Sequence, residues 1–323
     1  MKNDKILKQK QEVLNTTFRK AENKQRICCI PHCNELAINS HVLQKNGILN
    51  EISQDGHVWE SEADFFNDNL FHFKKVGINQ AFTFKGFCKK HDKQIFAPIE
   101  DYELNFDDYR TLLLFAYRTA LNEKVKKNVL IDWYELQKKS KILSDSLDNN
   151  DVDQLIEQET IGISDIDYFA NKIEKNLEDN TESYIFKYRI TKPQEICLAS
   201  HFTYETSRER DSYIKLNGKD YDLLTDIFIS YFPIEGENVL IMGYLKEQES
   251  KCKNYVDSFF NCTDDELFEK LSDLFLCRCE MWTCSENFYF SKIKPREKEI
   301  IRIFKESAES LDEDRTLKFK LFK

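Results

Sequence analysis

The chain has 323 residues, of which 41% are hydrophobic and 13% aromatic, and its formal net charge is −10. This amount of apolar material supports a folded core and about two domains, and it excludes a chain that is disordered throughout. The negative charge excludes a nucleic-acid-binding surface spread over the whole molecule, but it permits a local basic one.

The first predicted element is a basic helix within residues 1–27. A thin apolar stripe at helical spacing predicts a helix over 4–24. The stripe consists of Ile6, Val13, Leu14 and Phe18. Residues 1–26 contain eight Lys or Arg residues against three Asp or Glu residues, which suits either a local nucleic-acid contact or an ordinary solvated helix face.

The same N-terminus lacks the apolar core of a secretory signal. No run in the chain approaches the roughly 18–20 apolar residues of a membrane span. We therefore expect a cytoplasmic protein with no membrane partner. In that reducing compartment clustered Cys and His residues bind metal more often than they form disulfides.

Residues 28–100 contain an unusual concentration of Cys and His. Five of the six His residues and four of the ten Cys residues lie between 28 and 96. Structural zinc takes four Cys or His ligands in a tetrahedron, often as two close-spaced pairs that are far apart in the sequence. The segment therefore predicts a zinc-clamped module. Its candidate ligands are Cys28 or Cys29, Cys33, Cys88 and His91, with His32 as a rival in the first pair.

Two more His residues lie between the zinc pairs in β-prone sequence. One occurs in Ser40-His41-Val42, and His57 follows Gly56. A zinc pair, a His before a hydrophobic residue and a second zinc pair resemble the HNH, or ββα-metal, nuclease family over roughly residues 28–96. The resemblance implies a treble-clef fold in which zinc is purely structural.

The resemblance also implies catalytic roles. His41 would be the general base that activates water, and Asp92 would hold a Mg²⁺ or Mn²⁺ ion. His57 is a further catalytic candidate, with a hairpin-tip position as the alternative explanation. Basic residues beside Asp92 would face the phosphate backbone; they are Lys89, Lys90 and Lys93.

The chain departs from the family pattern at several positions. Ser40 replaces the Asp before the His, Asp92 replaces the final His, and only the distant Asn79 substitutes for the middle Asn. The order of the motifs is also similar to a group of bacterial proteins that have an HNH-like module before an α+β region. That second resemblance implies a role in bacterial defence.

Residues 101–182 follow a helical period. Apolar residues recur at helical spacing from Leu112 to Leu136. The polar run 148–151 interrupts this pattern, and we expect two further helices over 151–160 and 164–178.

From about residue 183 the period changes to that of strands. The predicted strands cover 184–190, 196–199, 225–231 and 238–244, with a hairpin loop at 233–237 between the last two. Predicted helices cover 252–260, 263–280 and 294 to about 309, the second beginning with a Thr263–Glu266 capping box. We expect the tail 311–323 to be frayed.

The Cys residues of this last segment fit buried helix positions better than a second metal site. His201 has no recognisable Ser or Asp partner for a hydrolase triad. We interpret no other motif of the sequence as a functional site.

These patterns together predict an α+β protein. Its segments are a basic helix over 1–27, an HNH-like treble-clef zinc module over 28–100, a helical region over 101–182, and a C-terminal domain over 183–323 with a small, mainly antiparallel sheet. The leading function is a metal-dependent, HNH-like endonuclease that acts on nucleic acid, with DNA favoured. The alternative is a non-catalytic zinc module that binds nucleic acid or a protein partner. A third hypothesis makes the C-terminal sheet a sensor or partner-binding domain that governs the module.

Overall fold

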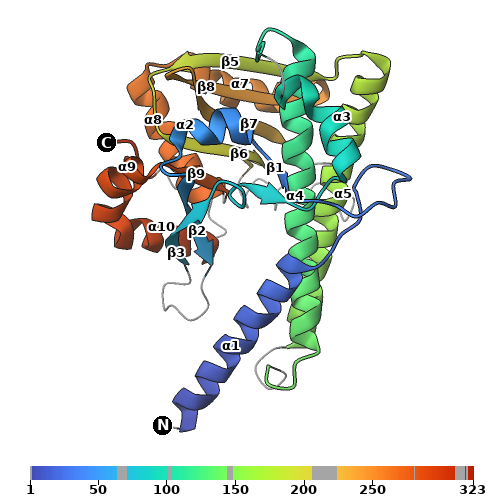
Figure 1. Ribbon diagram of the computed structural model, residues 1–323, viewed down its shortest axis with the longest axis vertical. Coiled ribbons are helices and arrows are strands. Elements are labelled where there is room, and N and C mark those ends of the chain that lie inside the picture. Colours follow the sequence, from blue (N-terminus) through green and yellow to red (C-terminus); the bar gives the residue numbers. More distant parts are fainter. Residues whose placement is uncertain are drawn as a thin grey trace.

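The computed structural model describes residues 2–63, 71–100, 103–143, 148–205, 224–279, 281–309, 317 and 319–323. It confirms the α+β class: Figure 1 shows an antiparallel sheet with helices packed around it. The helices are α1 (Lys2–Asn23), α2 (Asn50–Ile52), α3 (Lys89–Glu100), α4 (Tyr109–Lys138), α5 (Asn149–Asp179), α7 (Glu249–Phe260), α8 (Asp264–Asp273), α9 (Glu286–Phe288) and α10 (Glu297–Glu309). The strands are β1 (Ser40–His41), β2 (His57–Ala63), β3 (Phe71–Gly77), β4 (Thr83–Phe84), β5 (Tyr184–Thr191), β6 (Ile196–Phe202), β7 (Ile227–Ile234), β8 (Glu237–Leu245) and β9 (Trp282–Cys284).

Seven strands form one antiparallel sheet in the order β3-β2-β9-β6-β7-β8-β5. The four strands predicted after residue 183 are confirmed as β5 to β8, with ends that shift by up to three residues. The predicted hairpin is also confirmed. Its two-residue turn, Glu235-Gly236, has positive φ at both positions, as a tight antiparallel hairpin requires.

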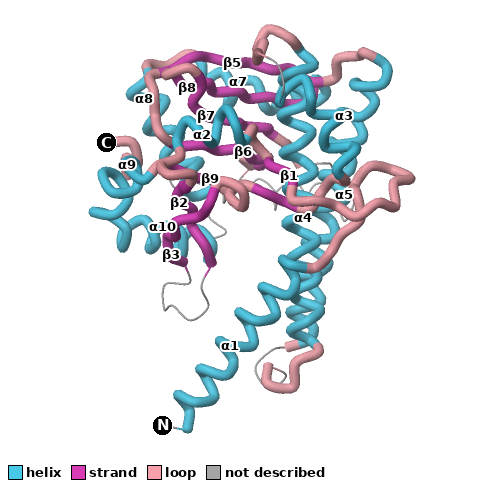
Figure 2. Tube along the Cα trace, viewed as in Figure 1, coloured by secondary structure: helices cyan, strands magenta, loops and turns pink. Residues whose placement is uncertain are grey.

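The same sheet takes two strands from the segment rich in Cys and His. β2 and β3 pair with each other, and Trp59 of β2 lies opposite Cys284 of β9. A separate two-stranded pair joins β1 to β4, with His41 opposite Thr83. Segments that are distant in the sequence therefore share one sheet (Figure 2).

Both faces of the central strands are buried. Along β7, Phe228 and Phe232 belong to the core cluster that includes Phe115 of α4. Ile229 and its neighbours on the other face belong to the cluster that includes Val256 of α7. Successive side chains of a strand point to opposite faces, so a strand covered on both sides carries a nearly continuous apolar run.

The helical region contains one long helix where two were expected. The prediction of separate helices over 151–160 and 164–178 is wrong, because α5 continues through Gly162. A Cβ at Gly162 would lie 2.8 Å from Cε of Lys127 on α4. This atom belongs to the flexible end of the Lys127 side chain, which can move aside, so the helix simply continues through a residue of low helix propensity.

The C-terminal elements confirm one expectation and correct two. The Thr263–Glu266 capping box is present, but α8 ends at Asp273 and a π-helical turn follows over Leu274–Arg278. A frayed tail is wrong for the last residues, because Leu321 and Phe322 are buried. The Leu321 N–H donates to Ser272 Oγ at 2.9 Å. Residues 311–316 and 318 of that tail lie outside the described residues.

Candidate metal centre

The first half of the metal centre is a tight backbone knuckle. The Cys28 N–H donates to the Glu35 carbonyl at 2.9 Å, and the Cys33 N–H donates to the Ile30 carbonyl at 3.1 Å. His32 has a positive φ of 63° within this turn, and its side chain is exposed. The turn brings the thiols of Cys28 and Cys33 to the same side of the knuckle.

The second half is the beginning of α3. Cys88 directly precedes the helix, and its carbonyl accepts the Asp92 N–H at 2.9 Å. Residues three apart lie on one helical face, so Cys88 and His91 present their side chains together. Two backbone hydrogen bonds hold the start of α3 against the knuckle. The Cys29 N–H donates to the Gly86 carbonyl and the Ile38 N–H donates to the Phe87 carbonyl, both at 2.7 Å.

The four side chains that meet are those of Cys28, Cys33, Cys88 and His91, and their ligand atoms all lie within 4.8 Å of one another. His91 Nδ1 is 3.3 Å from Cys28 Sγ and 3.4 Å from Cys88 Sγ. The Sγ atoms of Cys33 and Cys88 are 3.9 Å apart. A tetrahedral zinc with ordinary bond lengths has S–S edges of about 3.8 Å and S–N edges of about 3.6 Å. The donor set and its spacing therefore fit a structural zinc ion.

The structure also decides between the adjacent cysteines. Cys28 is in the ligand group, whereas the Cys29 side chain packs against the core cluster around α4. Burial raises the pKa of Cys29, so this thiol behaves as a small apolar side chain. No disulfide joins any of the ten cysteines, all of which lie in the described ranges.

The thiols of the centre differ in acidity. Burial raises the pKa of Cys28 to about 11. Burial also acts upward on Cys88, but the backbone N–H of His91 and the thiols of Cys33 and Cys28 lower its pKa below the ordinary value. Zinc takes thiolates, so binding a metal here releases protons from the site.

His41 lies on the short β1–β4 pair that leads into α3. Its ring Nε2 is 2.8 Å from the Ile78 carbonyl oxygen. A carbonyl only accepts, so Nε2 carries the hydrogen and Nδ1 is the basic nitrogen. Burial lowers the pKa of His41, the bond to Ile78 opposes that shift, and the charge of Lys45 adds to it.

Asp92 lies beside a buried arginine. Arg118 of α4 is only 1% exposed, and its Nη2 is 3.8 Å from Asp92 Oδ1. The same guanidinium pairs with Glu100 and stacks over Phe96, 4.1 Å from the ring centroid. Asp92 Oδ1 is buried and accepts no hydrogen bond from the described residues. Arg118 thus fastens α3 to α4, and its charge also reaches His41.

The remaining predicted residues lie apart or at the surface. His57 begins β2 at a tight turn, where its Nδ1 contacts the Asp55 carbonyl oxygen at 2.7 Å. It is exposed and is not part of the ligand group. The predicted basic residues of α3 are all exposed; they are Lys89, Lys90 and Lys93.

Sequence reasoning missed two charged residues at this site, Lys45 and Arg118. Lys45 comes only four residues after His41, but its contact with Asn79, which follows Ile78 far along the chain, depends on the tertiary fold. Arg118 lies within an apolar helical run and looks like an ordinary helix residue. No spacing in the sequence links either residue to the zinc ligands.

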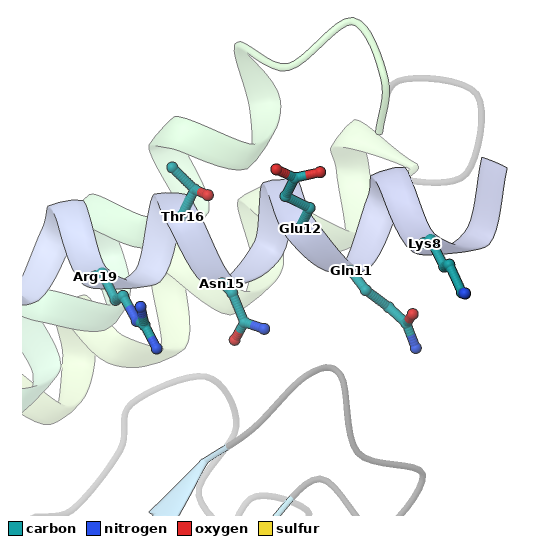
Figure 3. Close-up of a pocket in the computed structure, with 6 residues that line it drawn as sticks. All are labelled: Lys8, Gln11, Glu12, Asn15, Thr16 and Arg19. Atoms are coloured by element: carbon teal, nitrogen blue, oxygen red, sulfur yellow. The ribbon is translucent and has the colours of Figure 1, made fainter. Parts of the chain in front are cut away.

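A separate hollow follows one side of α1. It has a volume of about 570 Å³. Figure 3 shows Lys8 and Arg19 pointing to the same side of this helix. The lining residues are Lys8, Gln11, Glu12, Asn15, Thr16 and Arg19. None of them is a zinc ligand, so this hollow is distinct from the metal centre.

Within the described ranges, Cys28, Cys33, Cys88 and His91 are the only group of three or more metal-binding side chains close enough to share an ion. In the same ranges, no helix combines the length and apolar character needed to cross a membrane. The chain matches no family model, no curated protein and no solved structure. Functional inference therefore depends on the geometry of this site.

Proposed function

We propose that the protein is an HNH-like endonuclease that hydrolyses phosphodiester bonds of nucleic acid, DNA in preference, with a structural zinc and His41 as general base. The observation that carries the proposal is the orientation of His41. Its Nε2–H is fixed on the Ile78 carbonyl, so Nδ1 is available to take a proton. The lowered pKa of His41 keeps the ring neutral near pH 7.

The arrangement of elements supports the treble-clef part of the proposal. Two ligands come from the knuckle, and two come from the start of α3. The β1–β4 pair, which carries His41, lies between them in the sequence. Zinc supplies a cross-link that fixes α3 relative to the knuckle, as in other structural sites of this composition.

The chemistry assigned to the site is the attack of water on phosphorus. A water oxygen forms the new P–O bond while its proton passes to Nδ1 of His41. The bond from phosphorus to the leaving ester oxygen breaks, and that oxygen keeps the electron pair and takes a proton from solvent. The lysines of α3 are exposed, and exposed cations attract the anionic backbone of a nucleic acid.

The divalent-ion position is the weakest match to the family. Mg²⁺ is commonly bound through one or two carboxylates and several waters, and Asp92 offers one carboxylate oxygen without a hydrogen-bond partner among the described residues. However, Arg118 places a fixed positive charge 3.8 Å from that oxygen. The residues present therefore fit a divalent cation poorly.

Arg118 favours a second candidate function. If its charge takes the place of the cation at Asp92, the module binds nucleic acid or a protein partner without cutting. Salt-sensitive binding with no strand cleavage at any metal is the expected behaviour in that case.

A plasmid-nicking assay of the purified full chain separates these functions. With Mg²⁺ or Mn²⁺, the wild type should nick supercoiled DNA, and His41→Ala should lower the rate by a factor of about 10²–10⁴, the usual contribution of a general base. Zinc content should stay at about one per chain in the variant.

His72→Ala provides the matched control, since His72 lies on the edge strand β3 beside Glu62. It should cut like the wild type. Equal cutting by His41→Ala would exclude His41 as the base, whereas salt-sensitive binding without nicking by the wild type would support the second candidate.

A further inference from the structure

Lys45, Asn79 and His41 are linked by consecutive contacts. The Lys45 ammonium donates to Asn79 Oδ1 at 3.2 Å. Asn79 follows Ile78, whose carbonyl accepts the Nε2–H of His41 at 2.8 Å. Lys45 itself comes four residues after His41, in the π-helical turn Lys45–Leu49. The three side chains therefore belong to one constellation built on β1 and the turn after β3.

The turn that carries Asn79 is held in place by its backbone. The N–H groups of Gln80 and Ala81 donate to the Gly77 carbonyl at 2.8 and 3.0 Å. The Ile78 N–H donates to the Gly56 carbonyl at 2.9 Å. These bonds fix the Ile78 carbonyl and Asn79 before any ligand arrives, which lowers the entropy lost on binding.

Lys45 lacks a counter-charge within the described part of the chain. Two lysines of neighbouring segments do have one: Lys74 pairs with Glu62 at 2.5 Å, and Lys24 pairs with Asp132 at 2.5 Å. Lys45 is half-buried, and its partner in the described residues is the neutral amide of Asn79. The contact between the two side chains is exposed, so an anionic ligand can reach an ammonium that no carboxylate of the described residues pairs with.

The hydrogen-bond donors of Lys45 and Asn79 suit a ligand that is an anion and offers only acceptors. Asn79 uses its oxygen to accept from Lys45, so its amide group presents N–H donors to solvent. Lys45 retains further N–H bonds. A phosphodiester offers only acceptor oxygens and a negative charge, and it forms charge-assisted hydrogen bonds with such donors.

We propose that Lys45 and Asn79 form a phosphate-binding subsite beside His41, and that the subsite takes a phosphodiester of a nucleic-acid backbone. The inference rests on the proposed function, because it seats the phosphate on which His41 acts. In the bound complex Lys45 offsets the phosphate charge, and His41 directs its basic nitrogen at the attacking water.

The test is a binding titration that does not depend on cleavage. The full chain is labelled at histidine, and the His41 ring signals, assigned with His41→Gln, are followed by NMR. The added probes are a deoxythymidine dinucleotide, as a phosphodiester, and inorganic phosphate, as a free anion, at constant ionic strength. The dinucleotide should shift the His41 signals, and Lys45→Gln should weaken its binding about tenfold or more, the loss expected for one charge-assisted hydrogen bond.

Lys45→Arg should retain binding close to that of the wild type, because it keeps a cationic donor. Lys192→Gln, which removes an exposed lysine between β5 and β6, should bind like the wild type. Zinc content and the far-ultraviolet circular dichroism spectrum establish that each variant is folded.

Unweakened dinucleotide binding by a folded Lys45→Gln variant would overturn the subsite. So would a shift produced by inorganic phosphate but not by the dinucleotide, since the site would then bind a free anion. Lys45-dependent dinucleotide binding without any plasmid nicking would support the subsite and contradict the endonuclease proposal, so the two failures are distinguishable.

Discussion

His41 and His201 show how the surroundings of a histidine determine the pKa of its ring. Burial lowers the pKa of His41, which contacts only a neutral carbonyl at close range. Burial also acts to lower the pKa of His201, but the Asp226 carboxylate outweighs it and the pKa is raised. The surroundings of the two imidazoles thus shift their pKa values in opposite directions.

The His201 environment predicts a pH dependence of stability. Its Nδ1 is 2.7 Å from Asp226 Oδ2, and its Nε2 is 3.0 Å from the Ala116 carbonyl oxygen, so both ring nitrogens face acceptors. Glu123 adds a further upward influence on this pKa. The folded state holds the proton more tightly than the unfolded state. The stabilisation is therefore complete below the unfolded-state pKa of about 6.5 and is lost as the pH rises through the raised folded-state pKa.

Urea unfolding between about pH 6 and pH 9 measures this dependence. The free energy of unfolding should fall as the pH rises, and His201→Gln should flatten that slope. A wild-type stability that rises over the same range with a slope shared by His201→Gln would contradict the assignment.

Only some residues of the metal centre and its surroundings could be predicted from the sequence. Cys33, Cys88 and His91 followed from pair spacing, because zinc selects a small set of side chains. The choice of Cys28 over Cys29 could not follow, since it depends on which way each thiol points from the knuckle. The contacts of Lys45 with Asn79 and of Arg118 with Asp92 are tertiary and leave no local signal.

Elements with a strong local pattern were predictable. The strands β5 to β8 alternate or are continuously apolar, and α8 begins with a capping box that the sequence shows directly. The exceptions arise where packing overrides local propensity. Gly162 remains inside α5, which packs along α4, and the last residues of the chain are ordered because they pack against α8.

The packed C-terminus predicts a large effect from a residue near the end of the chain. Leu321 is fully buried in the cluster that contains Leu271 of α8. Leu321→Ala should lower the free energy of unfolding by about 2–5 kcal/mol, because it leaves a cavity in a packed core. Chemical unfolding of the two proteins measures the difference.

Lys323→Ala is the matched control at the same terminus. Its ammonium makes only an exposed pair with Glu269 at 3.8 Å, and such pairs contribute little to stability. A Leu321→Ala effect as small as that of Lys323→Ala would show that the tail does not contribute to the core.

At the scale of the whole molecule, the candidate metal centre is joined to the rest of the fold in two ways. The β2–β3 hairpin, which lies between the ligand pairs in the sequence, is part of the seven-stranded sheet, and Thr283 Oγ1 donates to the Trp59 carbonyl across 224 positions of chain. Arg118 fastens α3 to α4. The local sequence pattern could not show this pairing, because strand partners that are distant in the chain carry no periodic signal.

Elemental mass spectrometry of purified wild type, Cys28→Ser and Cys29→Ser gives their zinc content, and this zinc content tests the assignment of the metal centre most directly. The wild type and Cys29→Ser should each carry about one zinc per chain. Cys28→Ser should carry much less, because it replaces a ligand thiolate with a hydroxyl. A wild type without zinc, or a Cys28→Ser variant that keeps a full equivalent, would contradict the assignment of the metal centre.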